Sequence, residues 1–454
     1  MSQVWRAFSR GIGRHASALA LLLALVAWVA PALAAAKIER VVSPGGIEAW
    51  LVRDATVPLV AVEFAFKGGS SQDPADKPGV ANMITALLDE GAGELDAAAF
   101  QERMEQSALE LRFSDDRDHF RGSLRTLSER RDEAFELLRL ALMAPRFDAD
   151  AVERIRVQIL AELRRSATNP NDIASKAWWA AAFPGHPYGR PDKGTLESVA
   201  QIKPDDLRTY TRNVFAREHL KVAVVGDIDA AAVGAMLDHV FGGLPAQAQL
   251  AAVPYALPTG LGHRTVIELD VPQAVVSLGG IGLPRKHPDF ITAYVVNHIL
   301  GGGSFTARLY QEVREKRGLA YGVSTHLYPL ERSALLSGWT AVRADRTGEA
   351  VDLIEAEFRG MAENGPTEEE LAKAKDYLKG SYALRFDTST KIAAQLVQIQ
   401  VDDLGIDYIE RRNRLIDGVT LDDARRVAKS LLSTGLLVVV VGKPKGMTST
   451  APRG

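Results

Sequence analysis

The chain carries an internal duplication, and this feature limits the possible folds more than any single motif does. Residues 202–226 and 419–442 each begin with a hydrophobic residue shortly before an Asp-Asp pair, and each ends in an apolar run closed by glycine. The two runs, 220–226 and 436–442, start 216 positions apart, since 436 − 220 = 216. Short, β-branched apolar runs of this kind are typical of buried strands. We therefore expect the chain to fold as two homologous halves.

The order of the predicted elements also repeats, and this order indicates the fold class. In each half two strands with alternating apolar residues precede a helix, and further strands precede long helices. These segments are expected at 46–66, 79–90, 109–127 and 129–180 in the first half and at 264–284, 289–300, 320–343 and 347–402 in the second. The pattern predicts a tandem repeat of two homologous α+β domains. Each domain should hold a mostly antiparallel sheet with helices packed on one side.

Residues 1–36 are predicted to be a signal peptide and not part of the fold. Arg6, Arg10 and Arg14 precede a short apolar run at 18–30, and small residues at 32–36 offer cleavage sites. A permanent membrane helix needs about 20 apolar residues, so cleavage after export is the expected outcome and an uncleaved anchor is the alternative. We therefore expect a periplasmic protein without stable membrane insertion once the signal peptide is cleaved.

The remaining boundaries follow from changes in composition. Residues 37–244 and 263–444 should hold the two halves. The segment between them, 245–262, is punctuated by proline and has no amphipathic period, as is usual for a linker. Residues 445–454 are rich in Ser, Thr, Pro and Gly and are expected to form a flexible tail.

Charge and composition exclude several classes of function. The formal net charge is −3, and removal of the three arginines of the signal peptide makes it −6. Lys and Arg are interspersed among Asp and Glu, so the chain has no basic footprint for nucleic acid. The sequence contains no cysteine, which excludes disulfides, thiolate metal ligands and cysteine nucleophiles.

The predicted helix that starts at residue 79 has two different faces. Five apolar residues at helical spacing form one stripe that should pack inward: Val80, Met83, Ile84, Leu87 and Leu88. At about 100° per residue, Asn82, Thr85 and Ala86 share the opposite face. The chemistry of this second face decides whether the helix holds a metal.

On this pattern the sequence resembles the pitrilysin and insulysin family of zinc peptidases, which includes mitochondrial processing peptidase and its bacterial relatives. The resemblance covers essentially the whole chain after the signal peptide and implies tandem α+β repeats. In active members the matching helix carries His-x-x-Glu-His, in which the histidines bind zinc and the glutamate activates a water. Asn82, Thr85 and Ala86 stand at those three positions, and Glu162 stands where relatives have a third ligand.

These substitutions remove the metal chemistry that the resemblance would otherwise imply. An asparagine amide is a poor zinc ligand, a threonine hydroxyl is no base at neutral pH, and an alanine methyl has no lone pair. The carboxylate of Glu162 alone does not hold zinc, and the histidines after residue 36 form no i, i+4 pair. His298 is kept in view as a residual site. We expect this chain to bind no metal and to be inactive when isolated.

The segment 301–324 of the second half matches the family most closely. Phe305, Leu309 and Val313 recur every four residues. A helix should therefore begin just past the glycines at the start of the segment and end near Gly318, before a strand.

Arg314 falls on the last turn of that predicted helix, and Tyr321 follows seven residues later, after a turn that can bring the two side by side. Active relatives use an arginine and a tyrosine at this spacing, from their second half or second subunit, to face the zinc across the substrate. The resemblance therefore assigns Arg314 and Tyr321 to substrate binding and oxyanion stabilisation, because a guanidinium and a phenol are strong hydrogen-bond donors. Arg317 is a rival for the arginine role, and capping or packing is the structural alternative.

The loop before this helix is expected to contact substrate, because glycine lets a backbone approach a peptide closely. Its residues are Gly301, Gly302, Gly303 and Ser304. No Gly-Lys-Ser/Thr follows, so a phosphate-binding loop is a weak hypothesis. An extended peptide could also be accepted by edge pairing at the strands near 60–66 and 272–281.

Missing zinc ligands in one half and a retained Arg/Tyr pair in the other imply a complementary chain. We expect a heterodimer with a homologous, zinc-binding subunit, in which four repeat domains surround a chamber for unfolded or extended peptides. Two alternatives are a structural homologue with no catalytic role and a protein that binds peptides without cutting them. A homodimer of inactive chains is also open.

Overall fold

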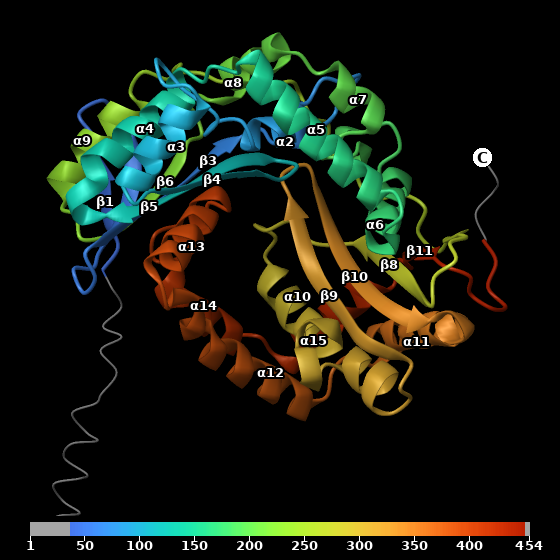
Figure 1. Ribbon diagram of the computed structural model, residues 1–454. Coiled ribbons are helices and arrows are strands. Elements are labelled where there is room, and N and C mark those ends of the chain that lie inside the picture. The colour runs from blue at the N-terminus through green and yellow to red at the C-terminus, as the bar shows by residue number, and fades with distance from the viewer. Residues whose placement is uncertain (1–36, 450–454) are drawn as a thin grey trace, which may run out of the picture.

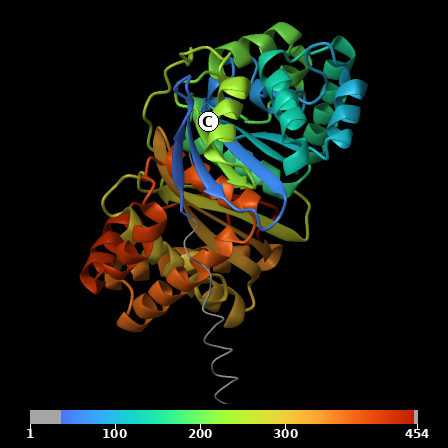
Figure 2. The ribbon, with the colours of Figure 1, turned by 90° about the vertical axis from the view of Figure 1, so that its left-hand side faces the viewer.

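The computed structural model describes residues 37–449, which fold into two halves of similar architecture (Figure 1). The blue-to-green elements of the first half lie above the orange and red elements of the second in Figure 2. The signal-peptide prediction concerns residues outside the described range. Between residues 37 and 449, no helix combines the length and the apolar character needed to cross a bilayer.

The first half is built on a six-stranded sheet with the order β1-β2-β6-β3-β5-β4. Its strands are β1 (Glu39–Val42), β2 (Glu48–Arg53), β3 (Leu59–Lys67), β4 (Glu110–Asp115), β5 (His119–Leu127) and β6 (Lys221–Gly226). Neighbouring strands are antiparallel except β2 and β6, which run parallel. On the central strand β3, the alternating residues Val60, Val62, Phe64 and Phe66 all point into one core.

The second half repeats this topology with a five-stranded sheet of order β7-β11-β8-β10-β9. Its strands are β7 (Arg264–Ile267), β8 (Gln273–Ile281), β9 (Ala320–Leu330), β10 (Ser333–Arg343) and β11 (Leu437–Val441). Here β7 and β11 form the parallel pair, and the other pairs are antiparallel. In sheet order these five strands match β2, β6, β3, β5 and β4. The predicted tandem of mostly antiparallel α+β domains is confirmed, and β1 is an addition to the first sheet.

One face of each sheet is covered by helices of its own half (Figure 1). In the first half these are α2 (Val80–Thr85), α3 (Ala97–Gln106), α4 (Arg131–Met143), α5 (Ala149–Ser166), α7 (Leu196–Gln201), α8 (Pro204–Val214) and α9 (Ala230–Phe241). In the second half they are α10 (Phe290–Asn297), α11 (Thr347–Asn364), α12 (Glu368–Gly380), α14 (Tyr408–Asp417) and α15 (Leu421–Leu432). Many of these helices begin at side chains that accept a backbone N–H of the first turn, among them Asp96, Thr195, Asp229, Thr367 and Thr420.

Short turns of other helical types connect these elements. They are η1 (Ser70–Gln72), η2 (Ser128–Arg130), η3 (Pro187–Gly189), η5 (Ser304–Thr306), η7 (Ala344–Arg346) and η8 (Ser381–Phe386), which are 3-10 helical, and η4 (His298–Gly302) and η6 (Tyr310–Glu315), which are π-helical.

The second face of each sheet is covered by a helix from the other half. Helix α13 (Ser389–Val401) packs on β3 and β6 of the first sheet, and α6 (Pro170–Ala182) packs on β8 and β11 of the second. In α6, Trp178 is 3% exposed and its indole N–H donates to the carbonyl of Leu437 at 3.1 Å. In α13, the Gln400 amide donates to the carbonyl of Val222 at 2.9 Å. The sequence pattern did not predict this exchange of helices.

The positions of the strands correct one expectation about peptide binding. Residues 60–66 and 272–281 were predicted to offer strands for edge pairing, and this is wrong because β3 and β8 are hydrogen-bonded to neighbours on both sides. At one end of each sheet the edge strand is β4 or β9, and at the other it is β1 or β7. A partner chain could therefore add to those strands and not to the central ones.

The segments between and after the halves make defined contacts. Residues 245–262 cross between the halves without helix or strand, and Gln72 exchanges two hydrogen bonds with the backbone of Ala251. Residues 445–449, the described part of the expected tail, lie against the second half. Met447 is buried, and the Ser449 hydroxyl accepts the N–H of Val266 at 2.9 Å.

Candidate functional site

The side chains of Arg314 and Tyr321 lie side by side at the end of the second sheet. The guanidinium carbon of Arg314 lies 4.6 Å from the ring centroid of Tyr321 and 4.9 Å from that of Tyr310. The guanidinium also donates to the hydroxyl of Tyr310, and its Nε lies 3.8 Å from Glu315. These cation–π contacts hold the arginine in place, while Tyr321 is 81% exposed. The spacing has the geometry that the sequence predicts, and the catalytic role of the pair stays a prediction.

The backbone beside this pair departs from a regular α-helix. The turn that carries Arg314, η6, has π-helical hydrogen bonding, a feature often found at functional sites. Leu309 and Val313 are fully buried, as the predicted stripe requires, but Phe305 is 68% exposed because it belongs to the separate turn η5. Gly318 takes φ +58°, which lets the chain reverse into β9.

Arg317, the rival of Arg314, is engaged elsewhere. Its guanidinium pairs with the carboxylate of Glu312, which Lys316 also contacts. It also donates to the backbone carbonyl of Glu312 at 3.1 Å. Arg314 is therefore the arginine in contact with Tyr321.

The three glycines of the 301–304 loop all lack room for a Cβ, which on Gly302 would lie 2.8 Å from Nδ2 of Asn297. A Cβ on Gly301 would lie 2.3 Å from Oγ1 of Thr325, and a Cβ on Gly303 would lie 2.7 Å from the carbonyl oxygen of His298. Both glycines are buried. Their small size is needed for packing inside the second half, whatever their role toward a substrate.

The other two residues of the loop face solvent. Gly302 and Ser304 are exposed, and Ser304 takes φ +49°, a conformation that residues with a side chain rarely adopt. Backbone strain of this kind is often kept at binding sites. Within the loop, these two residues are the ones placed to meet a peptide, and their predicted role is not tested by the geometry.

His298 has the surroundings of a packing residue. It is buried and stacks on Tyr377, with ring centroids 5.1 Å apart. Burial lowers its pKa, which favours the neutral imidazole. Its ring fills space behind the glycine loop.

The helix at the family's zinc position is shorter than predicted. The apolar stripe is buried as expected, but α2 ends at Thr85 instead of residue 90. The hydroxyl of Thr85 donates to the carbonyl of Asn82 at 2.7 Å. That carbonyl would accept the amide of Ala86 in a regular helix, and the amide of Ala86 turns to Met83 at 3.3 Å instead. Ala86 is thus the C-cap residue of a six-residue helix.

The side chain of Asn82 is engaged by a buried carboxyl group. It makes a hydrogen bond with Asp115 at the end of β4. Burial, helped by the negative charges of Asp192 and Asp116, raises the pKa of Asp115 to about 7, and the hydrogen bond with Asn82 acts in the opposite direction. The amide of Asn82 is therefore in contact with a carboxyl group whose pKa is raised.

Glu162 on α5, at the third-ligand position, is also already paired. Its carboxylate accepts a hydrogen bond from the ammonium of Lys193 at 2.8 Å, and both side chains are about half exposed. The pair lies at a cavity of about 560 Å³ between α5, α6 and residues 189–194. Lys193 supplies the positive charge that a metal would otherwise supply.

The residues at these positions do not fit a zinc ion. They offer an amide, a hydroxyl, a methyl group and one carboxylate that is bound to a lysine. Across residues 37–449, no group of three or more His, Cys, Asp or Glu side chains has the arrangement to hold a metal.

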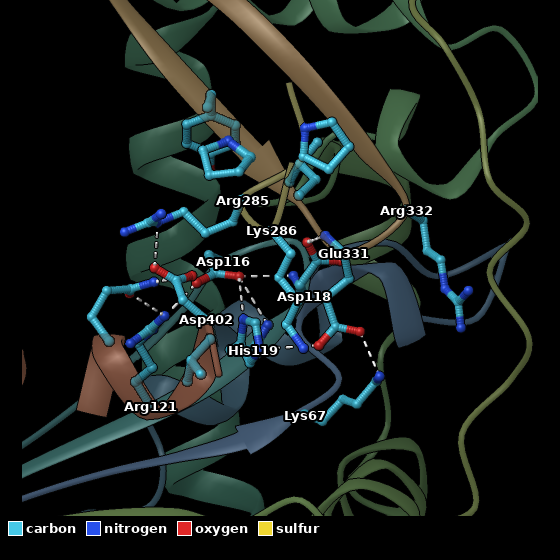
Figure 3. A pocket seen from close by; sticks show the side chains of 16 residues that line it. Lys67, Asp116, Asp118, His119, Arg121, Arg285, Lys286, Glu331, Arg332 and Asp402 are labelled. Carbon is cyan, nitrogen blue, oxygen red and sulfur yellow. Dashed lines mark hydrogen bonds and ion pairs between the residues drawn. The ribbon is translucent and has the colours of Figure 1, made fainter. Parts of the chain in front are cut away.

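A larger cavity of about 590 Å³ lies between the two halves (Figure 3). Figure 3 shows charged side chains from both halves directed at one another, where the turn between β4 and β5 meets the turn between β9 and β10. Glu331 from the second half pairs with Lys67 and, at 3.4 Å, with His119 from the first. The carboxylate of Asp118 accepts the backbone N–H of Glu331 at 3.0 Å. We call this the interface cavity.

His119 is the central positive group of the interface cavity. Its imidazole lies 3.5 Å from Asp116 and 3.4 Å from Glu331, one carboxylate from each half. Burial alone would lower the pKa of His119, but the hydrogen bonds and charges of these two carboxylates outweigh it and raise the pKa to about 9. The same contacts outweigh burial at Asp116 and hold its pKa well below the usual range. His119 is therefore positively charged at neutral pH and links a carboxylate of the first half to one of the second.

The remaining charges of the interface cavity tie it to α13. Arg121 donates to Asp116 at 3.2 Å and to the amide oxygen of Gln398 at 3.0 Å. Arg285 donates to Asp402 at 3.2 Å. Sequence analysis missed this network because its contacts join residues up to 277 positions apart and no local spacing connects them.

Together, two equivalent α+β halves, a helix without zinc ligands at the family's metal position and an adjacent Arg/Tyr pair are features of the tandem-repeat metallopeptidase class. Comparison with family models supports this. A model described as insulinase (peptidase family M16) matches residues 49–195, and one described as peptidase M16 inactive domain matches residues 201–378. The chain belongs to this peptidase family, as the resemblance predicted.

Bacterial relatives include both zinc proteases and a non-peptidase by name. A non-peptidase homolog YmxG of Helicobacter pylori is 29% identical and covers 73% of this chain and 77% of its own. An uncharacterized zinc protease of Mycobacterium tuberculosis is 28% identical over 91% of this chain and 95% of its own.

Solved structures show the same architecture. A crystal structure described as a peptidase M16 inactive domain, from Pseudomonas fluorescens, is 28% identical with a TM-score of 0.84 and covers 91% of this chain and 99% of that one. A protease from Helicobacter pylori, 20% identical with a TM-score of 0.80, covers 89% of this chain and 99% of that one and shows the fold alone.

Proposed function

We propose that this chain is the non-metal-binding subunit of a heterodimeric zinc metallopeptidase. One observation carries the proposal. Arg314 is held between the rings of Tyr310 and the exposed Tyr321, while the residues at the family's zinc positions in the same chain are not a set of zinc ligands. A homologous subunit would hold the zinc. Substrates would be unfolded or extended peptides that fit a chamber between the two subunits.

Within this chain, the role of Arg314 and Tyr321 would be to bind and polarise a peptide carbonyl. The guanidinium and the phenol O–H are donors aimed from one place, so they can hold the carbonyl oxygen and stabilise negative charge on it. Neither group is a nucleophile. The attacking water would therefore come from the partner subunit, and this chain alone would be inactive.

The proposed location is the periplasm of a bacterial-type cell, after cleavage of residues 1–36. The argument is the basic, apolar and small-residue pattern of that segment. The mature protein would work on peptides that are already unfolded, because an enclosed chamber excludes folded chains. Amino-terminal sequencing of the protein recovered from cells tests the cleavage directly.

A catalytically inert homologue is the second candidate. It is favoured by the names of two similar proteins, the non-peptidase homolog of Helicobacter pylori and the inactive domain of Pseudomonas fluorescens. In that case the chain would act as a scaffold or would bind peptides without assisting hydrolysis. The exposed Arg/Tyr pair would then have no catalytic role.

Reconstitution separates the two candidates. The chain is mixed with a zinc-bearing family member from the same genome, hydrolysis of an unfolded peptide is followed, and zinc is measured on each chain. We expect activity only in the mixture and zinc only on the partner. Arg314→Ala and Tyr321→Phe should each lower kcat/KM by roughly 10²-fold, as the loss of one oxyanion donor does.

Arg317→Ala is the matched control, because this arginine lies three residues further along the chain but pairs with Glu312. It should stay within about two-fold of wild type, as expected for a surface ion pair. Full activity of both Arg314→Ala and Tyr321→Phe would contradict the catalytic assignment and favour the inert homologue. Zinc bound to the isolated chain together with hydrolysis would overturn both candidates.

A further inference from the structure

The cavity next to the Arg/Tyr pair is lined by three arginines and by no acidic residue. It has a volume of about 400 Å³. Its walls include Arg314, Tyr321, Arg343 and Arg346. We call it the arginine cavity. Arg343 is the last residue of β10 and Arg346 ends the turn η7, so neither is close to Arg314 in sequence.

The composition of the arginine cavity differs from that of the interface cavity and of the cavity beside Glu162. The interface cavity is lined by Asp116, Asp118, Glu331 and Asp402 as well as by cations, and the cavity beside Glu162 includes Asp172 and Asp192. Positive charges in those two places meet negative charges in the same wall. The wall of the arginine cavity contains three arginines and no carboxylate.

Two of the three arginines have carboxylate partners outside the wall, and these partners are replaceable. Arg343 makes two hydrogen bonds of 2.8 Å with Asp345, and Arg346 makes bonds of 2.6 Å and 2.8 Å with Glu349. All four side chains are at least two-fifths exposed, and exposed ion pairs contribute little to stability. A carboxylate entering the cavity can therefore compete for these donors.

The third arginine has a looser carboxylate contact. Arg314 is held by the rings of Tyr310 and Tyr321 and lies 3.8 Å from Glu315, without a paired fork-to-carboxylate contact. The carboxylate partners of all three arginines, Asp345, Glu349 and Glu315, lie outside the cavity wall. A guanidinium recognises a carboxylate through two parallel hydrogen bonds, which is specific as well as favourable.

We infer that the arginine cavity binds a carboxylate of a peptide, so that Arg343 and Arg346 select chains with an acidic group next to the segment held by Arg314 and Tyr321. As a statement about cleavage specificity this rests on the proposed function, whereas as a statement about binding it concerns this chain alone. The carboxylate can belong to an Asp or Glu side chain or to the carboxyl terminus of the peptide. Both sources present the same chemistry, and the test distinguishes them.

The test measures binding of labelled, unstructured peptides to the isolated full chain by fluorescence anisotropy. One peptide carries a single internal Asp and an amidated end, a second carries Asn in its place, and a third carries Asn and a free carboxyl terminus. We expect the Asp peptide to bind about five-fold tighter than the Asn peptide, with the difference reduced at high salt. If the free terminus is the preferred source, the third peptide shows the gain instead.

The double variant Arg343→Gln and Arg346→Gln should bring the three peptides within about two-fold of one another, as loss of the bidentate contacts requires. Arg359→Gln is the matched control, because Arg359 lies near the other end of α11 and is exposed. It should leave the preference unchanged. Circular dichroism checks that each variant is folded.

Equal binding of all three peptides, or a preference that survives the double variant, overturns the inference. Absence of measurable binding overturns it as well, because every group of the cavity is in this chain. The outcome is separable from that of the proposed function. If catalysis depends on Arg314 but the three peptides bind equally, only the inference is contradicted. If the chain prefers a carboxylate but no partner-dependent hydrolysis is found, only the proposed function is contradicted.

Discussion

The two halves of the molecule share one topology and differ in what they do with it. Five strands of each sheet occupy matching positions, and each half covers one face of its sheet with its own helices. The first half has filled its family metal position with internal contacts: Asn82 bonds to Asp115, and Glu162 bonds to Lys193. The second half leaves Tyr321 open to solvent, with Arg314 partly buried beside it.

Equivalent positions on the inner faces of the sheets show the same divergence. The fifth residue of β3 is Glu63, which pairs with Ser123 on β5, and the fifth residue of β8 is Ser277, which pairs with Trp339 on β10. The first sheet thus carries a carboxyl group under α13, and the second carries a partly exposed indole. The comparison shows that the shared fold fixes the positions of the side chains, while the residue types at equivalent positions differ between the halves. The predictions below test how independent the halves are.

The largest effect is expected where one half stabilises the other. Trp178→Ala removes the buried indole by which α6 of the first half covers β11 of the second, and should destabilise the protein by about 3–5 kcal/mol. Urea unfolding measures the cost, and hydrogen exchange should show weaker protection in β8 and β11. Val157→Ala on the exposed side of α5 is the control, expected within about 0.5 kcal/mol. Unchanged protection of the second sheet would show that the exchanged helix is not needed.

The next effect concerns the ionic contacts of His119 between the halves, whose contribution to stability depends on pH. The pKa of His119 is raised from 6.5 to about 9 in the folded protein, so its stabilising contribution is complete below about pH 6.5 and is lost as the pH rises through about 9. We expect wild type to lose about 2–3 kcal/mol relative to His119→Gln between pH 7 and 10, a figure that follows from the size of the shift. Denaturation curves across this range measure it. If the stability of the two proteins depends on pH in the same way, the pKa of His119 is not raised by folding.

A smaller effect is expected inside the first sheet, where removing the titrating group should stabilise the protein and not destabilise it. Burial raises the pKa of Glu63 from 4.5 to about 7, against the hydrogen bond from Ser123. Because the folded protein holds this proton more tightly, stability falls as the pH rises from about 4.5 through 7. Glu63→Gln should therefore stabilise the protein at pH 8 by about 1–2 kcal/mol, and less at pH 5. If Glu63→Gln is less stable than wild type at both pH 5 and pH 8, burial of the charged Glu63 carboxylate does not destabilise the protein.

The smallest effect is expected at the former metal position. Lys193→Ala breaks a half-exposed ion pair with Glu162 and should cost less than about 1 kcal/mol. It frees the carboxylate, yet the chain should still take up no zinc, because the other three positions offer no ligand. Metal analysis after dialysis against zinc checks this. Stoichiometric zinc in the variant would show that Lys193 alone kept the metal out.

Much of the fold was predictable because its signals are local. The apolar runs at 220–226 and 436–442 became the strands β6 and β11, and the stripe of α2 is buried as its spacing requires. The helix after the glycine loop was located, but its π-helical form was not, because side-chain periodicity does not distinguish the two hydrogen-bond patterns. The early end of α2 also escaped prediction, since it depends on which donor takes the carbonyl of Asn82.

The sequence by itself determined the duplication, the α+β class, the missing zinc ligands and the seven-residue interval between Arg314 and Tyr321. Only the tertiary structure decided that α6 and α13 exchange halves, that β4 and β9 lie at sheet edges, and that Arg343 and Arg346 join Arg314 around one cavity. The physical reason is that periodicity and ligand chemistry are properties of neighbouring residues. An apolar helix face fits many apolar surfaces, and the partner it takes is chosen only when the whole chain packs.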